Sequence, residues 1–303
     1  MSETDAEPEL DTPRQVPPEP AGAETTAPPT PRREVIYRHS LVVRITHWIN
    51  VVAVTLLLMS GLQIFNAHPA LYWGQYGADF DPPVLEIKAE GLGSGHPVGV
   101  TAVGRLAIRT TGVLGVSGGR SGAPEARGFP RWATLPGWRD LATGRRWHFF
   151  LAWILVINGL AYLVAGVLNG HFRRDLAPRW AQLRPSHVLK EIWDHILLRH
   201  PTGEAARSYN VLQKFAYLAV VFILLPMMVA TGLTMSPGFD AVAPWLLDLF
   251  GGRPSARTLH FVSANLIVLF VLVHVVEVFI AGAFNEIGSM ITGRYAIRTE
   301  AGH

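Results

Sequence analysis

Four histidines of this 303-residue chain lie within or at the ends of long apolar stretches. The stretch 259–279 has the sequence LHFVSANLIVLFVLVHVVEVF, and it carries His260 and His274 fourteen residues apart. His47 and His148 lie near the beginnings of two other apolar stretches. A polar group within hydrocarbon is costly and is by default a candidate for function. These four imidazoles are therefore the first candidates for chemistry.

The spacing of His260 and His274 predicts that both lie on one face of a helix. Fourteen residues at ~100° each return to within about 40° of the starting direction, with a rise of ~21 Å. One helix would therefore carry two sites at different depths.

Composition identifies the elements that must position these side chains as membrane helices. The chain is 49% hydrophobic and only 16% charged, and its mean hydropathy is +0.25, which is too apolar for a soluble domain of this size. Each of four apolar runs, at 45–65, 148–168, 215–235 and 259–282, is long enough for the ~20 helical residues that cross a bilayer. We predict an all-α integral membrane protein with a four-helix transmembrane bundle, in which Pro226 kinks the third helix.

Composition also excludes several classes of site and partner. The chain has no cysteine, which rules out disulfides, thiolate ligands, iron–sulfur clusters and thioether-linked c-type haem. The sequence pI is about 9.4, but the basic residues lie beside the membrane runs and form no dense stripe, so we expect membrane lipid and no nucleic acid as a partner.

The amino-terminal segment is predicted to be a disordered tail. Residues 1–34 are acidic and rich in proline, with hardly any large apolar side chain, and such a segment cannot bury enough surface to fold. It also lacks the pattern of a signal peptide, so the first membrane run is expected to be an uncleaved insertion signal. The membrane domain is expected to cover 35–303.

The distribution of arginines predicts the orientation. By the positive-inside rule, the richer side is cytoplasmic, which places both termini and the segment 169–214 in the cytoplasm. Only the arginines that flank the membrane runs are compared. Those on the richer side are Arg32, Arg33, Arg38, Arg44, Arg173, Arg174, Arg179, Arg184, Arg199, Arg207, Arg294 and Arg298, and those on the outer side are Arg131, Arg139, Arg145, Arg146, Arg253 and Arg257.

The connections between the runs have distinct expected roles. The outer loop, 66–147, is rich in glycine, proline and tryptophan, and is expected to be ordered but irregular, as a cap or a docking surface. Within it, Arg105, Arg109 and several glycines argue against a fifth crossing near residue 100. The segment 179–200 has apolar and basic groups at helical spacing and is expected to lie along the cytoplasmic membrane surface. The segment 243–252 is expected to be a short outer surface helix.

The predicted orientation pairs the four histidines by depth. Runs two and four begin outside and run one begins inside, so His148 matches His260 (the outer pair) and His47 matches His274 (the inner pair). Two imidazoles facing each other across a helical bundle are the usual axial ligands of a b-type haem. Zinc is the alternative, but each pair supplies only two protein ligands. The sequence therefore favours two haem b groups.

Other residues near these levels are candidates for contacts with the haems. Arg145, Arg146 and Arg257 lie within three residues of the outer histidines and Arg44 lies near His47, so they are candidates for binding propionates, with a role in topology as the alternative. Five glycines could let a porphyrin approach the backbone, or simply allow close helix packing; they are Gly61, Gly159, Gly166, Gly232 and Gly282.

Four segments resemble the bacterial cytochrome b561 and nickel-hydrogenase cytochrome b family. They are THWIN, RRWHFFLAWILVINGLAY, NVLQKFAYLAVVFILLPMMVATGLTMSP and HFVSANLIVLFVLVHVVEVF. The resemblance covers about 40–300, and the family includes membrane subunits of formate dehydrogenase and thiosulfate reductase. It implies a di-haem b subunit of the bacterial inner membrane that carries electrons between a periplasmic oxidoreductase and the quinone pool in a respiratory chain. The implied ligands are His148 and His260 for the outer haem, and His47 and His274 for the inner haem.

The resemblance also implies an exchangeable quinone beside the inner haem, with an asparagine at the start of the third helix. The segment NVLQK supplies Asn210, followed by Gln213 and Lys214; the alternative is an ordinary helix start with interfacial polar residues. Glu277 is a candidate proton relay to the quinone, or a partner for an interfacial arginine.

The partner and the exact activity stay open at this point. HPALYWG and the long outer loop resemble cytochromes encoded for molybdopterin oxidoreductases of sulfite-oxidase type, and a hydrogenase-like subunit is the other candidate partner. The resemblance implies an electron-transfer subunit rather than an enzyme that transforms a substrate alone. The alternatives are a stand-alone b561-type quinone-coupled oxidoreductase acting on a small diffusible substrate, and a haem-free transporter or anchor, for which an inverted repeat is expected but is not visible.

Overall fold

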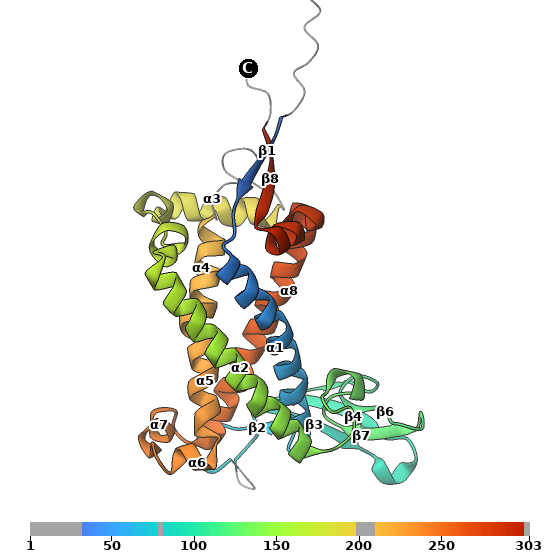
Figure 1. Ribbon diagram of the computed structural model, residues 1–303. Helices are drawn as coiled ribbons and strands as arrows, with labels where there is room; N and C mark the ends of the chain where they lie inside the picture. Colours follow the sequence, from blue (N-terminus) through green and yellow to red (C-terminus); the bar gives the residue numbers. More distant parts are fainter. Residues whose placement is uncertain (1–31, 78–80, 198–209, 300–303) are drawn as a thin grey trace, which may run out of the picture.

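The computed structural model describes residues 32–77, 81–197 and 210–299. Long helices lie side by side, with a small β-structure at one end of the bundle and a pair of strands at the other (Figure 1). Following the predicted orientation, we call the end with the β-structure the outer end and the opposite end the inner end. The predicted disorder of residues 1–31 concerns residues outside those described.

Four helical segments are long and apolar enough to cross a membrane, which confirms the predicted bundle. They are α1 (Leu41–Phe65), α2 (Leu141–Leu168), the segment Val211–Thr234 and α8 (Arg253–Thr292). The first two begin before their apolar runs because polar caps start them: Ser40 accepts a hydrogen bond from the backbone of Val43, and Asp140 from that of Thr143. Hydropathy finds only the part of a helix that crosses hydrocarbon.

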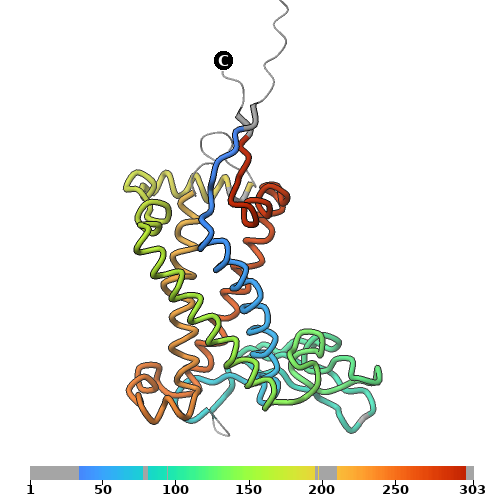
Figure 2. The backbone as a smooth tube through the Cα atoms, in the orientation of Figure 1, coloured from blue at the N-terminus to red at the C-terminus, as the bar shows by residue number. Residues whose placement is uncertain are grey.

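The third and fourth spans are irregular at a proline and a glycine. The third consists of α4 (Val211–Ala219), a π-helical turn at Val220–Leu224 and α5 (Leu225–Thr234). The irregularity expected at Pro226 therefore lies in the turn just before it, where a missing N–H weakens the regular ladder. In α8, Gly282 has a φ of 109° and lies at a kink in the helix, a conformation that favours glycine. The end of α8, drawn in red, turns away from the axis of the bundle (Figure 2).

The spans pack as two helical pairs, α1 with α2 and α5 with α8. Asn158 of α2 is buried and joins the first pair, because its Nδ2 donates to the carbonyl of Thr46 (2.8 Å) and to Oδ1 of Asn50 (2.7 Å). A buried amide is stable in an apolar bundle only when hydrogen-bonded. This contact fixes the two helices at the level of His47.

The outer loop contains β-structure, so the prediction of an irregular loop was wrong. Four strands form an antiparallel sheet in the order β2 (Ala70–Leu71), β3 (Leu85–Glu90), β4 (Val98–Val103) and β5 (Leu106–Arg109). A second antiparallel pair consists of β6 (Gly115–Gly118) and β7 (Pro124–Arg127). Short strands joined by glycine turns, such as the one at Gly104 with a φ of 55°, leave weak periodicity in the sequence. The segment near residue 100 is thus strand and not a fifth crossing, as predicted.

The strands β2 to β7, which we call the β-module, pack on the outer ends of α1 and α8. Phe65 of α1 forms a buried cluster with Leu71 and Ile87. The ring of Phe65 also stacks on Phe261 of α8 with centres 4.9 Å apart. The module is therefore joined to the residue that directly follows His260.

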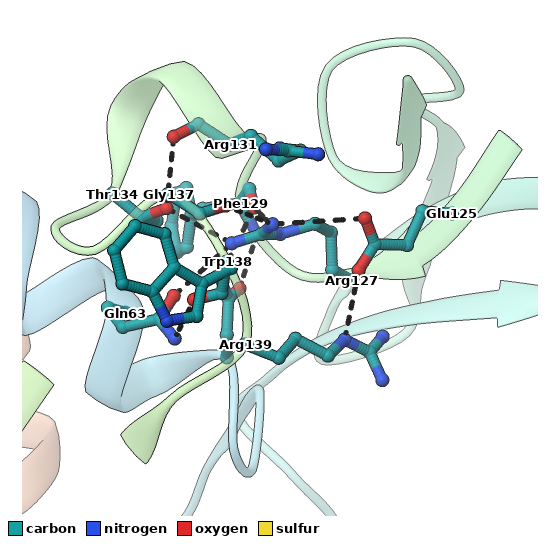
Figure 3. A network of polar contacts seen from close by, with 10 residues as sticks. Gln63, Glu125, Arg127, Phe129, Arg131, Thr134, Gly137, Trp138 and Arg139 are labelled. Carbon is teal, nitrogen blue, oxygen red and sulfur yellow. Dashed lines mark hydrogen bonds and ion pairs between the residues drawn. The ribbon is translucent and has the colours of Figure 1, made fainter. Parts of the chain in front are cut away.

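A buried arginine holds the end of the outer loop (Figure 3). Arg127 donates to the carbonyls of Phe129 (2.7 Å) and Gly137 (3.0 Å) and to the side chains of Thr134 (3.0 Å) and Gln63 (3.2 Å). Gln63 belongs to α1, so the network connects the loop to the bundle. Burial lowers the pKa of the Arg127 guanidinium, but an arginine stays charged in a protein.

At the inner end, β1 (Arg32–Tyr37) pairs antiparallel with β8 (Arg294–Thr299). Residues 32–34 are therefore strand, which corrects the predicted tail boundary at 34: the pairing partner lies some 260 positions away and leaves no local signal. Arg38 follows β1, stacks on Tyr295 with its Cζ 4.4 Å from the ring centre, and forms an ion pair with Glu286 at 3.9 Å. This strand pair joins the two ends of the membrane domain.

Short helices cover both ends of the bundle. At the inner end, a π-helical turn at Phe172–Leu176 and a 3-10 turn at Trp180–Leu183 precede α3 (Pro185–Ile196), which lies across the bundle axis (Figure 1). Further 3-10 turns at Leu92–Ser94 and Arg131–Ala133 belong to the outer loop. At the outer end, α6 (Pro237–Asp240) and α7 (Pro244–Leu249) connect the last two spans, so the short helix expected at 243–252 is present.

Replacing Arg127 by methionine should loosen the β-module. The substitution removes four donated hydrogen bonds and leaves buried acceptors unpaired, so a loss of about 3 kcal/mol of local stability is expected. Limited proteolysis with chymotrypsin, which does not depend on arginine, should then cut the segment 115–140 faster. Arg120→Met, at an exposed position, is the control; equal cleavage of the two variants would contradict the role given to Arg127.

Acid should open the strand pair at the inner end. Burial, assisted by the neighbouring Arg38, lowers the pKa of His39 to about 4, whereas an unfolded histidine has a pKa of about 6.5. The open state therefore binds an extra proton between these values, and stability present above about pH 6.5 is lost as the pH falls toward 4. Hydrogen exchange in 294–299, corrected for intrinsic rates, should be faster at about pH 5 than at about pH 7. His39→Gln should remove this dependence and His96→Gln, an exposed control, should keep it; a flat profile in the unaltered protein would contradict the prediction.

Candidate functional site

The structure brings the four histidines together in the predicted pairs. The rings of His148 on α2 and His260 on α8 face each other near the outer end, with centres 6.3 Å apart and planes at 62°. The rings of His47 on α1 and His274 on α8 lie 6.2 Å apart with planes at 72°. Both sites thus share α8, as the fourteen-residue spacing predicted.

These separations fit a single metal ion between the two rings of each pair. A nitrogen–metal bond of ~2 Å plus ~1.1 Å from the ring nitrogen to the ring centre places two opposed ring centres ~6.2 Å apart. Among the described residues, no group of three or more histidine or acidic side chains is placed to hold a metal ion. Two imidazoles without further protein ligands suit a metal whose remaining positions are filled by a macrocycle, as in haem.

Two hydroxyl groups that the sequence did not single out hold the outer histidines. Ser60 Oγ lies 3.1 Å from Nδ1 of His148, and Thr231 Oγ1 lies 3.0 Å from Nδ1 of His260. Each hydroxyl donates its own proton to a carbonyl one helical turn earlier, at Leu56 (2.8 Å) or Met227 (2.6 Å). A sequence signal was present, because Ser60–Gly61 and Thr231–Gly232 form the same hydroxyl–glycine step.

Of the five candidate glycines, two lie against the outer rings. A Cβ on Gly61 would lie 3.3 Å from Cε1 of His148, and one on Gly232 would lie 3.5 Å from Cε1 of His260. Gly166 faces Phe172 instead. Around Gly159 and Gly282 the space is open: beyond their own helix, no atom of the described residues would lie within 4 Å of an added Cβ. The structure therefore relates Gly61 and Gly232 to the histidine side chains themselves.

Aromatic side chains surround the inner pair. Phe270, one turn before His274 on α8, stacks on that ring with centres 6.0 Å apart and planes at 8°. Trp48 meets the ring of His47 edge-on at 5.4 Å and donates from Nε1 to the carbonyl of Met290 (3.1 Å). The inner pair is thereby connected to the part of α8 beyond the turn at Gly282.

The candidate propionate-binding arginines mostly have partners within the protein. Arg44 donates to the carbonyl of Ile291, and its buried Nε has no partner among the described residues. Arg257 donates to the carbonyl of His68 and lies over Phe65 at 5.4 Å. Arg145 lies over Phe149 at 5.6 Å, and Arg146 is exposed. Arg145, Arg146 and Arg257 lie at the outer ends of their helices, and Arg44 lies at the inner end of α1.

The candidate quinone residues begin the third span. Asn210 and Gln213 form a reciprocal capping box, in which Asn210 Oδ1 accepts from the backbone of Gln213 (2.8 Å). Lys214 is buried and donates from Nζ to the carbonyl of Ala177 (3.3 Å) and to Gln182 Oε1 (3.2 Å). These contacts are those of the alternative considered above, an ordinary helix start with interfacial polar residues. Glu277, half-buried and three residues after His274, interacts electrostatically with that ring.

Comparisons with known proteins agree with this geometry. The model of the prokaryotic cytochrome b561 family matches residues 38–293. A putative protein-methionine-sulfoxide reductase subunit, YedZ1, of Azospira oryzae is 28% identical over 247 residues, which cover 81% of this chain and 92% of the relative. A probable Ni/Fe-hydrogenase B-type cytochrome subunit of Cupriavidus necator is 24% identical over 159 residues, or 48% of this chain and 64% of the relative. No solved structure matches.

The matched region contains all four histidines and all four membrane-spanning segments. Its family binds haem b, which is the group that the paired imidazoles fit. The chain therefore belongs to the prokaryotic cytochrome b561 family and is a multi-pass membrane cytochrome of the b type.

Proposed function

We propose that this protein is a di-haem b subunit that carries electrons between a periplasmic oxidoreductase and the quinone pool of a bacterial inner membrane. The proposal rests on one observation: two histidine pairs, with ring separations of 6.3 and 6.2 Å, lie near opposite ends of one membrane bundle. An electron carrier across a membrane needs one site near each surface, and α8 supplies a ligand to both.

The chain's residues would hold and separate the two groups. His148 and His260 would be the axial ligands of the outer haem, and His47 and His274 those of the inner haem. When bound, the haems supply reversible one-electron transfer. The protein fixes their vertical offset, because the two ligands on α8 are separated by fourteen residues, or ~21 Å of helix rise. It also excludes water from the sites with an apolar bundle.

The partner is proposed to bind at the outer end. With both termini in the cytoplasm, as the arginine distribution favours, the outer pair and the β-module face the periplasm. The two relatives are a reductase subunit and a hydrogenase cytochrome subunit by name, which supports a partner oxidoreductase. We propose a molybdopterin-type enzyme, because the outer loop resembles cytochromes encoded for such enzymes and the relative that covers most of this chain is a reductase subunit.

Quinone is proposed to react at the inner end, near the start of the third span. Asn210 and Gln213 use their side-chain oxygens in the capping box, and each amide nitrogen carries two N–H donors that could bind a quinone oxygen. Glu277 lies on the helix that carries His274 and is the proposed proton acceptor or donor for that quinone.

Alanine substitution should remove one haem at a time. His260→Ala should eliminate the outer haem and His274→Ala the inner one, each lowering the content from two haems per chain to one, because a single imidazole leaves one axial position empty. Haem per chain and the reduced absorption band of purified protein measure this. His96→Ala, an exposed histidine of the outer loop, should keep both haems. Two haems in both ligand variants, or one or none in the unaltered protein, would overturn the proposal.

A partner should remain bound under mild detergent. Co-purification of a soluble oxidoreductase with the unaltered chain, and its loss from Arg127→Met protein with a loosened β-module, would support docking at the outer end. If the chain purifies alone and reduces quinone steadily with a small diffusible donor, the stand-alone activity is the correct one.

Two substitutions at Asn210 separate quinone binding from helix capping. Aspartate is as good a cap as asparagine, whereas alanine costs about 1 kcal/mol. Asn210→Asp should therefore preserve thermal stability and haem content but raise the KM for a soluble quinone analogue, because it lacks the amide donor. Asn210→Ala should lower stability as well. An unchanged KM in the aspartate variant would show that Asn210 serves only as a cap.

A further inference from the structure

We propose that Ser60 and Thr231 are positioning residues that fix the proton on Nδ1 of both outer histidines and thereby lower the reduction potential of the outer haem. This inference rests on the proposed di-haem function, which it deepens by assigning a different environment to each site.

The direction of the hydrogen bonds follows from the protein's own donors and acceptors. The single hydroxyl proton of Ser60 is used toward the carbonyl of Leu56, at 2.8 Å, and that of Thr231 toward the carbonyl of Met227, at 2.6 Å. A hydroxyl oxygen keeps lone pairs when its proton is committed. At 3.1 and 3.0 Å, Nδ1 of the histidine must then be the donor. Nε2 of each outer ring is left unprotonated and able to bind a metal.

The burial of the two hydroxyls makes this arrangement persistent. Ser60 and Thr231 are both 0% exposed, so no water competes for Nδ1 at these positions. The following glycine allows the approach: a Cβ at Gly61 would lie only 3.3 Å from Cε1 of His148, closer than side chains ordinarily pack. At Gly232 the corresponding distance, to Cε1 of His260, is 3.5 Å, which is an ordinary contact. We call each hydroxyl–glycine pair, Ser60–Gly61 or Thr231–Gly232, the seat of the ring that it contacts.

The seat occurs twice in equivalent places of the bundle. Ser60–Gly61–Leu62 lies on α1 and holds a histidine of its neighbour α2, while Thr231–Gly232–Leu233 lies on α5 and holds a histidine of its neighbour α8. Each helical pair thus supplies one histidine and one hydroxyl acceptor to the outer site. At the inner pair, the ring contacts within the described part of the chain are with Trp48 and Phe270, and Glu277 and Glu286 interact electrostatically with His274. No hydroxyl–glycine step of the outer kind is found against these rings among the described residues.

A donated hydrogen bond from Nδ1 makes an imidazole a more basic ligand. A more basic axial ligand stabilises the oxidised iron, so the hydroxyl seats should lower the potential of the outer haem. The backbone at Leu57 and Met228 also hydrogen-bonds these rings. The hydroxyls of Ser60 and Thr231 act on Nδ1 in addition to these carbonyls.

Redox titration of purified full-length protein with both haems tests this assignment. Ser60→Ala and Thr231→Val should each shift the outer component to a higher potential, the double variant should shift it further, and the inner component should stay in place. His260→Ala identifies the outer component by its loss. Ser60→Thr and Thr231→Ser, which keep a hydroxyl, should restore the unaltered potential. Thr55→Val removes an exposed α1 hydroxyl that donates to the carbonyl of Val51 and should change nothing.

The low-spin electron paramagnetic resonance signal of the outer haem provides a second readout. It should change in Ser60→Ala and Thr231→Val and return in the two conservative variants. If Ser60→Ala loses the outer haem, Ser60→Cys replaces it, because a thiol is of similar size but a weak acceptor; an upward shift there supports the proposal and no shift overturns it. Two haems in the unaltered protein with unchanged potentials in the variants would overturn this inference alone, whereas fewer than two haems would overturn the proposed function itself.

Discussion

The structure depends on the cost of burying an imidazole in hydrocarbon. A membrane interior supplies no water to hydrogen-bond a ring nitrogen, so the protein or a bound group must do so. The outer rings meet this demand on one side through buried hydroxyls of neighbouring helices, and on the other side they face each other at a separation that fits a metal. The positions of the helices follow from satisfying both sides at once.

The elements outside the membrane maintain this arrangement. The β-module packs through Phe65 on Phe261, the residue after His260, and the Arg127 network reaches α1 at Gln63. At the other end, Trp48 next to His47 is hydrogen-bonded to the last turn of α8. At the level of each histidine pair, a side-chain contact thus connects the α1–α2 pair with the α5–α8 pair. A partner that binds the module would bind next to the outer site.

Much of the fold and the pairing of the four histidines could be predicted because bilayer thickness and helix rise are strong constraints. Hydropathy located four spans, and the interval between His260 and His274 placed two sites on one helix. The β-module was missed, since its strands are short and its turns irregular in sequence. Ser60 and Thr231 were missed because a serine or threonine within a membrane helix usually bonds its own backbone, and a further contact across helices leaves no local signal.

The sequence by itself determined the membrane class, the four spans, the absence of thiolate chemistry and the position of each histidine along its helix, all of which depend on composition and on distance along a helix. The tertiary structure alone decided which helices pair, where the outer loop folds back on Phe65, and that His148 and His260 are held by hydroxyls. These features depend on side-chain contacts between residues tens to hundreds of positions apart. Such contacts form only when helices pack with a defined rotation, and the rotation of one helix against another is not encoded in the periodicity of either.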